Sequence, residues 1–440
     1  MNSPIRILLS LSLLLSAGCS HGDTKPAATA KITEMQVSGE NETNSPEAQA
    51  KPYVVLVSID GFRWDFLNQF DPPALTSIHR EGAAAQGLIP IYPSKTFPNH
   101  YSIVTGLYAK NHGIVSNEFF DPKRKAIFSL PDRQAVQDGS WYGGTPIWNE
   151  ARKHGMLSAS YFWIGSDAEI SGMRPNYYYV YDETVPQEAR VAQVVRWLEL
   201  PAERRPHLIT LYFGEVDRAA HDHGTKSPEL AEAIRKVDQS ISELRRGLDK
   251  TGLPINLILV SDHGHLDVEP AKTLAIDASP ETEKLLAKFQ ILGVGPQMIL
   301  YLKEGEDRKT IEETRRVLSQ QAKNYRVLTA KELKRLNYDG NPRTGDLVVD
   351  PDPGYLIGTK NRMPKARGSN HGWDASRSKE MQGVLFAVGP SFKPGARVPA
   401  FENIHVHALV NEILSMKPTG TVDSKRRVIL PLLKSGDSGK

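Results

Sequence analysis

The sequence predicts an α/β fold in which helices cover both faces of a mainly parallel sheet. Near-continuous apolar runs alternate along the chain with amphipathic helices, and the runs lie at 53–59, 208–213, 256–260 and 384–388. Runs of this kind are typical of strands that are buried on both faces. Strands that alternate with helices favour a parallel sheet with a helical layer on each side.

The helices have clear start and stop signals. Ser227 can cap a helix that has Pro228 in its first turn, and Thr145-Pro146 can open another that Gly155 closes. The first of these helices carries one apolar stripe, formed by Leu230, Ile234, Val237, Ile241, Leu244 and Leu248. A third helix is marked by Val191, Val194, Val195 and Leu198.

Composition is that of a globular protein with a near-neutral surface. The 440 residues include 54 Lys+Arg and 51 Asp+Glu, with 40% hydrophobic and 24% charged residues. These values exclude a disordered, collagen-like or polytopic membrane chain. A net charge of +3 gives no reason to expect a nucleic-acid polymer as partner. Cys19 is the single cysteine, so no intrachain disulfide can form.

The first residues predict export from the cytoplasm. Arg6 precedes an apolar run at 7–15, and small residues then lead to Cys19. Residues 1–18 resemble a bacterial lipoprotein signal, so Cys19 is the expected lipidation site, although Ser16 stands where Leu is usual. An ordinary cleaved secretory peptide is the alternative. We therefore expect a lipoprotein on the periplasmic side of the outer membrane or at the cell surface, held to the membrane by its lipid.

The rest of the chain divides by composition. Residues 19–52 are polar and almost free of large apolar side chains, which predicts a flexible tether. Residues 53–416 form the expected catalytic domain, with a less regular insertion around 266–370 and a C-terminal tail at 417–440. Within the insertion, two strand-like runs around a helix at 310–321 suggest a small βαβ unit.

Three apolar strands lead into an aspartate, namely Asp60, Asp217 and Asp262. Ligands of open α/β sheets collect at the carboxyl ends of strands, and three carboxylates gathered there repel one another unless a cation lies between them. Histidines accompany these aspartates at His221, His263 and His371. Mixed Asp and His ligands without cysteine suit zinc. Any one of these aspartates alone could be a helix cap.

A threonine completes the predicted site. Pro98 and the apolar residues after it indicate a short helix that ends near Gly106, which puts Thr96 at a helix amino terminus. Backbone N–H groups there favour an anion, and a metal that lowers the pKa of the hydroxyl would make Thr96 a nucleophile. The alternative is a simple helix cap.

With these residues, the chain from about 53 to 416 resembles the nucleotide pyrophosphatase/phosphodiesterase family of the alkaline phosphatase superfamily. The motifs that carry the resemblance are SIDGFRWDF, YPSKTFPNHYSIVTGLYAKNHGIVSNEFFDP, YFGEVDRAAHDHG, VSDHGH and NHGWD. The resemblance implies an alkaline phosphatase-like sandwich with a smaller inserted subdomain.

The resemblance also implies two zinc ions. Asp217, His221 and His371 would hold one; Asp60, Asp262, His263 and the Thr96 hydroxyl would hold the other. Thr96 would attack phosphorus and form a phosphothreonine that water hydrolyses, releasing a nucleoside 5′-monophosphate. Asn117 matches the side chain that donates to a non-bridging phosphoryl oxygen.

Four further residues match the nucleotide pocket of that family. Phe97 and Tyr181 match the aromatic pair that sandwiches the base, and Trp163 and Asp167 match the pocket wall. Ile164 stands where relatives that prefer nucleotides often have proline, which leaves base selectivity open. The expected partner is therefore a small nucleotide; neither its identity nor the oligomeric state follows from the sequence.

Other activities of the same superfamily remain as alternatives. A sulfatase would need a cysteine or serine nucleophile, and Thr96 occupies that position. A phosphomonoesterase would place a lysine and an arginine near the segment FWIGSDAEI, which contains neither. A phosphocholine-type diesterase would need an aromatic and acidic cage, for which Asp167 and Tyr181 are candidates. A lipoprotein that only binds metal would not need Thr96 at a helix start.

Overall fold

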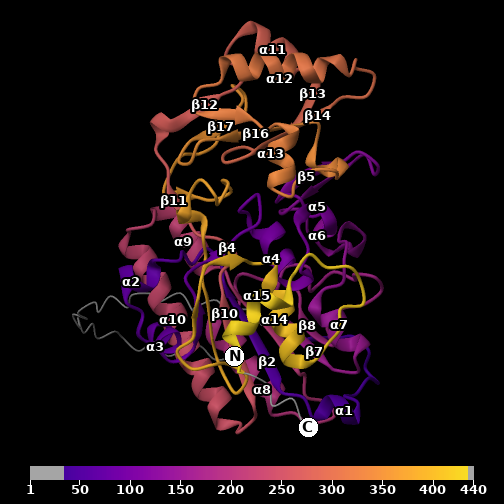
Figure 1. The fold of residues 1–440 in the computed structure, drawn as a ribbon, viewed down its shortest axis with the longest axis vertical. Coiled ribbons are helices and arrows are strands. Elements are labelled where there is room, and N and C mark those ends of the chain that lie inside the picture. Colours follow the sequence, from indigo (N-terminus) through magenta and orange to yellow (C-terminus); the bar gives the residue numbers. More distant parts are fainter. Residues whose placement is uncertain (1–33, 435–440) are drawn as a thin grey trace, which may run out of the picture.

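The computed structural model describes residues 34–434, and its main feature is a nine-stranded sheet with helices on both faces (Figure 1). Five neighbouring strands at its centre are parallel, in the order β8 (Tyr177–Tyr179), β7 (Ser158–Tyr161), β9 (Leu208–Phe213), β2 (Tyr53–Ile59) and β10 (Ile255–Val260). Their carboxyl ends therefore share one edge, as the sequence predicts.

The flanking strands make the sheet mixed instead of parallel throughout. Next to β10 lie β19 (Leu385–Val388), β3 (Ala83–Ala85) and β20 (Arg397–Val398), and β1 (Gln36–Val37) borders β8. The run at 384–388, expected to be parallel, is antiparallel to β10, with Leu385 opposite Val260. The insertion leaves and rejoins the sheet at its carboxyl edge, so the chain enters β19 from that side. The apolar content of a run indicates that the strand is buried, but it does not indicate the direction of the strand in the sheet.

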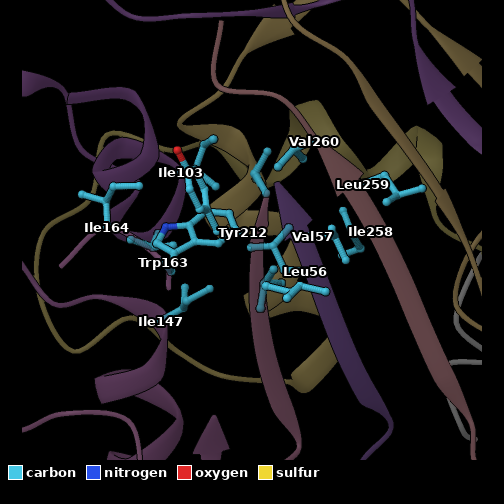
Figure 2. Packing of buried hydrophobic residues seen from close by; sticks show 14 of the residues in the cluster. Leu56, Val57, Ile103, Ile147, Trp163, Ile164, Tyr212, Ile258, Leu259 and Val260 are labelled. Atoms are coloured by element: carbon cyan, nitrogen blue, oxygen red, sulfur yellow. The ribbon is translucent and has the colours of Figure 1, made fainter. Parts of the chain in front are cut away.

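The helices form two layers. One layer contains α3 (Pro73–Glu81), α8 (Gln187–Leu198) and α10 (Pro228–Lys250), and the other α4 (Thr96–Thr105), α7 (Ile147–Lys153) and α14 (His405–Leu414). Ser227 caps α10 by accepting the Leu230 N–H at 3.1 Å, and the predicted apolar stripe of α10 is buried. Figure 2 shows Ile103 of α4, Ile147 of α7 and Leu56 of β2 among the buried side chains that pack between these helices and the sheet. Truncating such a fully buried Leu to Ala costs about 2–5 kcal/mol of stability.

The insertion forms a smaller lobe with its own core, seen in orange beyond the carboxyl edge of the sheet (Figure 1). Its sheet has the order β13 (Phe289–Leu292), β14 (Met298–Leu302), β16 (Leu347–Pro351) and β15 (Tyr325–Val327), with all neighbours antiparallel. Helices α11 (Pro280–Leu286), α12 (Lys309–Gln321) and α13 (Ala330–Arg335) accompany it. The expected β14–α12–β15 unit is present, but β16 separates its two strands.

Shorter elements complete the fold. Four two-stranded pairs are β4 (Leu88–Ile89) with β21 (Phe401–Glu402), β5 (Glu118–Asp121) with β6 (Ala126–Ser129), β11 (Leu266–Asp267) with β18 (Ser369–Asn370), and β12 (Thr273–Ala275) with β17 (Leu356–Gly358). The remaining α-helices are α1 (Pro46–Gln49), α2 (Phe66–Phe70), α5 (Ala109–His112), α6 (Arg133–Gln137), α9 (Glu215–His223) and α15 (Arg426–Ile429).

Both predicted flanking segments differ from expectation where the structure describes them. Within the expected tether at 19–52, β1 pairs with β8, and the buried Asn44 side chain donates to the carbonyl oxygens of Ala202 and Arg205 at 2.8 and 2.7 Å. Within the expected tail at 417–440, Ile429 and Leu432 are fully buried. Backbone pairing and hydrogen bonds of polar side chains hold the described part of residues 19–52 against the fold. The hydropathy of the sequence indicates neither kind of contact.

The predicted signal at 1–18 and lipidation at Cys19 lie outside the described residues. Across residues 34–434, no helix is both long and apolar enough to cross a bilayer.

Candidate active site

The three aspartates meet at the carboxyl edge of the sheet because their strands end in register. Ile59 of β2 lies opposite Phe213 of β9, and Ser58 lies opposite Val260 of β10. Asp60 and Asp262 follow their strands closely, and Asp217 lies in the first turn of α9. His221 follows one turn later on the same face of α9.

One group of ligands consists of Asp60, Asp262 and His263. The His263 Nε2 atom lies 3.4 Å from Asp60 Oδ1 and 3.1 Å from Asp262 Oδ2. All three side chains are buried, and these two oxygens have no hydrogen-bond partner among the described residues. Burial, together with the neighbouring carboxylates, raises the pKa of Asp60 and of Asp262 well above the usual range. A bound cation would counteract both shifts, because it stabilises the charged carboxylates.

The second group consists of Asp217, His221 and His371. Asp217 Oδ1 lies 3.5 Å from His221 Nε2 and 3.6 Å from His371 Nε2, and the two nitrogens are 3.0 Å apart. Burial acts to raise the pKa of Asp217, but the nearby histidines hold it well below its usual range. His263 and His371 stack at 3.5 Å between ring centroids, so the two groups are adjacent.

The histidine tautomers show that a cation fits between these groups. The Nδ1 atoms of His221, His263 and His371 lie 3.0, 3.1 and 2.7 Å from the carbonyl oxygens of Ser369, Gly264 and Ser94. A carbonyl can only accept, so each Nδ1 carries the proton and each Nε2 presents a lone pair. Burial lowers the pKa of His263 and His371, which keeps both neutral. Lone pairs that face carboxylate oxygens repel them, and a metal ion removes that repulsion.

Thr96 lies at the predicted helix start, directly beside the first ligand group. It is the first residue of α4, and its Oγ1 atom is 3.2 Å from His263 Nε2. Its backbone N–H has no acceptor among the described residues. Asn117 is close by, because its Oδ1 accepts the Phe97 N–H at 3.0 Å. A phosphoryl group beside Thr96 would therefore find donors next to the nucleophile.

The sequence analysis did not identify two residues that position Thr96 and the Asp60/Asp262/His263 group. Tyr212 donates its hydroxyl to Asp60 Oδ2 at 2.6 Å. His100 Nδ1 lies 3.0 Å from the Thr96 carbonyl and 3.2 Å from Asp262 Oδ2, and its Nε2 is 2.8 Å from Ser58 Oγ. Burial lowers the pKa of His100. His100 lies in the sequence motif around Thr96. Its contacts could not be predicted from that motif, because they depend on how α4 packs against β2.

A cavity of about 290 Å³ opens at the ligand groups, and eight of the predicted site residues line it: Asp60, Thr96, Phe97, Trp163, Asp167, Tyr181, Asp217 and His221. The Tyr181 ring is 37% exposed and therefore accessible to a ligand, whereas Trp163 is 1% exposed and donates Nε1–H to the His100 carbonyl at 3.1 Å. Trp163 is therefore part of the cavity wall and also holds His100 through this hydrogen bond. Asn117 is not part of the cavity lining.

Two arginines also line this cavity, although the neighbouring segment at 162–170 contains none. Arg133 of α6 donates to Asp167 Oδ2 at 2.6 Å, and its guanidinium carbon lies 5.8 Å from the centre of the Tyr181 ring. Arg218 of α9 lies at the same cavity. Both come from other parts of the chain, so reading residues near Asp167 in sequence could not find them.

Comparisons with known proteins place the chain in a family. The sequence model described as type I phosphodiesterase / nucleotide pyrophosphatase matches residues 54–374. Ectonucleotide pyrophosphatase/phosphodiesterase family member 1 of Rattus norvegicus is 37% identical over 397 residues, which cover 87% of this chain and 43% of the rat protein. Venom phosphodiesterase of Naja atra is 33% identical over 392 residues, which cover 87% of this chain and 46% of the venom protein. The chain thus spans less than half the length of these relatives.

A solved structure is similar over its whole length. Murine ectonucleotide pyrophosphatase/phosphodiesterase 5, as an inactive threonine-to-alanine variant in complex with AMP, gives a TM-score of 0.79 at 29% identity. The match covers 87% of this chain and 100% of the murine chain. The chain belongs to the type I phosphodiesterase / nucleotide pyrophosphatase family.

Proposed function

We propose that this protein hydrolyses phosphodiester or pyrophosphate bonds of nucleotides and releases nucleoside 5′-monophosphates. The observation that carries the proposal is the Thr96 hydroxyl, which lies 3.2 Å from His263 in a residue that lines the same cavity as Phe97 and Tyr181. The relatives named as nucleotide pyrophosphatases and phosphodiesterases support it. So does the murine relative that was solved with AMP and is inactive as a threonine-to-alanine variant.

The ligand groups fit two zinc ions. Asp217, His221 and His371 would hold one, and Asp60, Asp262, His263 and the Thr96 hydroxyl would hold the other. When bound, the ions supply positive charge that stabilises an alkoxide and the charge that develops on a transferring phosphoryl group. Three oriented Nε2 lone pairs and two buried carboxylate oxygens without partners support this assignment.

Thr96, Asn117 and His100 have separate roles in the proposed reaction. Thr96 Oγ attacks phosphorus as the bond to the leaving oxygen breaks, which gives a phosphothreonine. The Asn117 NH2 group and the Thr96 backbone N–H donate to the non-bridging oxygens. A water molecule then attacks the same phosphorus from the side that the leaving group vacated, and Thr96 regains its hydroxyl. His100 holds the Thr96 carbonyl and thereby the first turn of α4.

The cavity favours a nucleotide over a choline headgroup. Phe97 and Tyr181 can stack on a base, which contributes about 1–3 kcal/mol. A choline cage would need free acidic groups, whereas the Asp167 carboxylate is engaged by Arg133. Arg133 could bind the additional negative charge of a phosphomonoester. However, the positive charge of Arg133 is already neutralised by its ion pair with Asp167.

A substrate panel at fixed enzyme concentration tests the proposal. The nitrophenyl ester of a nucleoside 5′-monophosphate should be cleaved with a kcat/KM at least tenfold above those of nitrophenyl phosphate and nitrophenyl phosphocholine. Faster turnover of the monoester or of the choline ester would overturn the assignment of nucleotide diesters. Nucleoside triphosphates, dinucleotides and cyclic dinucleotides in the same panel would identify the preferred leaving group.

We also propose that the mature chain is lipidated at Cys19 and lies outside the cytoplasm on a membrane surface, with nucleotides as its small-molecule partners. The motif at the amino terminus supports this. Cys19→Ala should release the protein into the soluble fraction. Unchanged membrane fractionation of that variant would contradict lipid anchoring.

A further inference from the structure

We propose that Lys95 is a positioning residue of the active site, where it holds Asn117 in place through Ser116. This inference rests on the function proposed above, in which the Asn117 NH2 group donates to the transferring phosphoryl group. Lys95 is buried, and its Nζ atom donates to the Ser116 hydroxyl at 3.1 Å. Among the described residues, no carboxylate pairs with this amino group. A buried lysine without a counter-charge is unfavourable for stability, and such a group is typical of a functional site.

Thr96 lies between two hydrogen bonds that join the same two segments, the start of α4 and the loop before β5. Lys95 precedes Thr96 and bonds to Ser116, whereas Phe97 follows Thr96 and donates its N–H to Asn117 Oδ1 at 3.0 Å. The first bond holds the residue before Asn117, and the second sets the rotation of the Asn117 amide. Together they fix the direction in which the NH2 group points.

The Ser116 hydroxyl is suited to accept the bond from Lys95. It donates its own proton to Gln297 Oε1 at 3.4 Å, which leaves the lone pairs of its oxygen for the Lys95 amino group. Gln297 is fully buried and directly precedes β14 of the inserted lobe. The loop that carries Asn117 is therefore held from α4 on one side and from the inserted lobe on the other.

The backbone leaves room for the Lys95 side chain at Gly372, the residue after the ligand His371. A Cβ atom at Gly372 would lie 3.3 Å from Lys95 Cε and 3.0 Å from Pro296 Cβ. Gly372 also has a φ of +129°, which side chains rarely allow. The aliphatic part of Lys95 thus packs under the turn that presents His371, and only its amino group reaches the Asn117 loop.

The test begins with two single variants of the zinc-loaded full chain. Lys95→Met keeps the length of the side chain and removes the donor. It should lower kcat for a nitrophenyl nucleotide ester by about 10–100-fold, because small displacements of a positioned group have effects of this size. KM and zinc content should change little. Ser116→Ala removes the acceptor, leaves Lys95 in place and should give a similar loss.

A double-mutant cycle shows whether Lys95 acts through Asn117. Once Asn117→Ala has removed the amide, adding Lys95→Met should lower kcat by less than about twofold more, because the two changes disrupt one interaction. Hydrogen exchange of the Phe97 amide is a second measurement that does not depend on activity. In Lys95→Met this amide should exchange about tenfold faster, because its bond to Asn117 Oδ1 opens more often.

Lys110→Met is the matched control. Lys110 lies on α5, ahead of the same loop, and its Nζ atom donates to Asp339 Oδ1 at 2.8 Å. This variant should leave both kcat and the exchange of the Phe97 amide unchanged. Thermal unfolding shows whether each variant is folded.

Several outcomes would contradict the inference. Wild-type kcat in a folded Lys95→Met or Ser116→Ala variant would show that their bond does not position Asn117. Losses that multiply in the double variant would mean that Lys95 acts directly on Thr96 or on the phosphoryl group. A wild-type protein that cleaves no diester would overturn the proposed function. The exchange measurement would then still test the link, and an unchanged Phe97 amide in Lys95→Met would refute it.

Discussion

The Phe97 backbone N–H donates to Asn117 Oδ1 at 3.0 Å, and this bond ties the loop after α5 to the first turn of α4. It uses the amide oxygen of Asn117, so the NH2 group is the part left to donate elsewhere. The bond therefore orients Asn117 next to the nucleophile, which is the arrangement that donors to a transferring phosphoryl group require.

Asn117→Ala should lower kcat by about 10²–10³-fold, because one preorganised donor to the transition state is lost. Zinc content should not change, since Asn117 belongs to neither ligand group. Steady-state kinetics on a nitrophenyl nucleotide ester, with metal analysis of the same sample, provide the measurement. A variant with near-normal kcat would contradict the proposed role of Asn117.

Thr96→Ala should remove turnover by several orders of magnitude while folding and most of the bound zinc remain, because the other ligands are intact. Thr96→Ser keeps the hydroxyl and should retain part of the rate. Mass spectrometry of rapidly quenched wild-type protein should detect a phosphorylated peptide that contains Thr96. Full activity in the alanine variant would show that another group attacks phosphorus.

Tyr181→Ala should raise KM for nucleotide esters by about tenfold or more, since base stacking contributes about 1–3 kcal/mol. Tyr181→Phe keeps the ring and is the matched control. A simple aryl phosphonate ester has no base, so its kinetics should change little in either variant. Equal losses on both substrates would place Tyr181 outside the base-binding site.

Asp262→Asn should abolish one metal site and yet stabilise the metal-free protein at neutral pH. Burial raises the pKa of Asp262 in the folded state, so deprotonation favours the unfolded chain as pH rises above the unfolded pKa of about 3.9. The wild type without metal should therefore lose stability from pH 5 to pH 8, and the variant should lose less. Thermal unfolding in chelator across this range is the measurement, and equal slopes would contradict it.

His407 should contribute to unfolding in acid. Burial lowers its pKa to about 4, so between pH 6.5 and 4 the unfolded chain takes up a proton that the folded chain does not. Stability should fall by about 2 kcal/mol from pH 7 to pH 5 on account of this group, and the effect should be absent above pH 7. His407→Leu should flatten the dependence by that amount in urea unfolding of the zinc-loaded protein. An unchanged slope would show that His407 does not titrate in this range.

The sequence by itself determined the elements and the type of site. The apolar runs matched β2, β9 and β10, and the capping residue Ser227 marked the start of α10. Because parallel strands end at one edge, aspartates at three strand ends could be expected to meet there. These inferences hold because burial, capping and strand ends depend on residues that are near one another in the chain.

Tertiary structure decided what depends on contacts between distant segments. The direction of β19, the position of β16 between β14 and β15, and the packing of residues 36–52 all follow from where the chain returns to the sheet. For the same reason, the contacts of Arg133 with Asp167 and of His265 with Asp217 cannot be inferred from the spacing of residues in the motifs. Hydropathy reports whether a side chain is buried, whereas hydrogen bonds and ion pairs between distant residues depend on which segments the fold brings together.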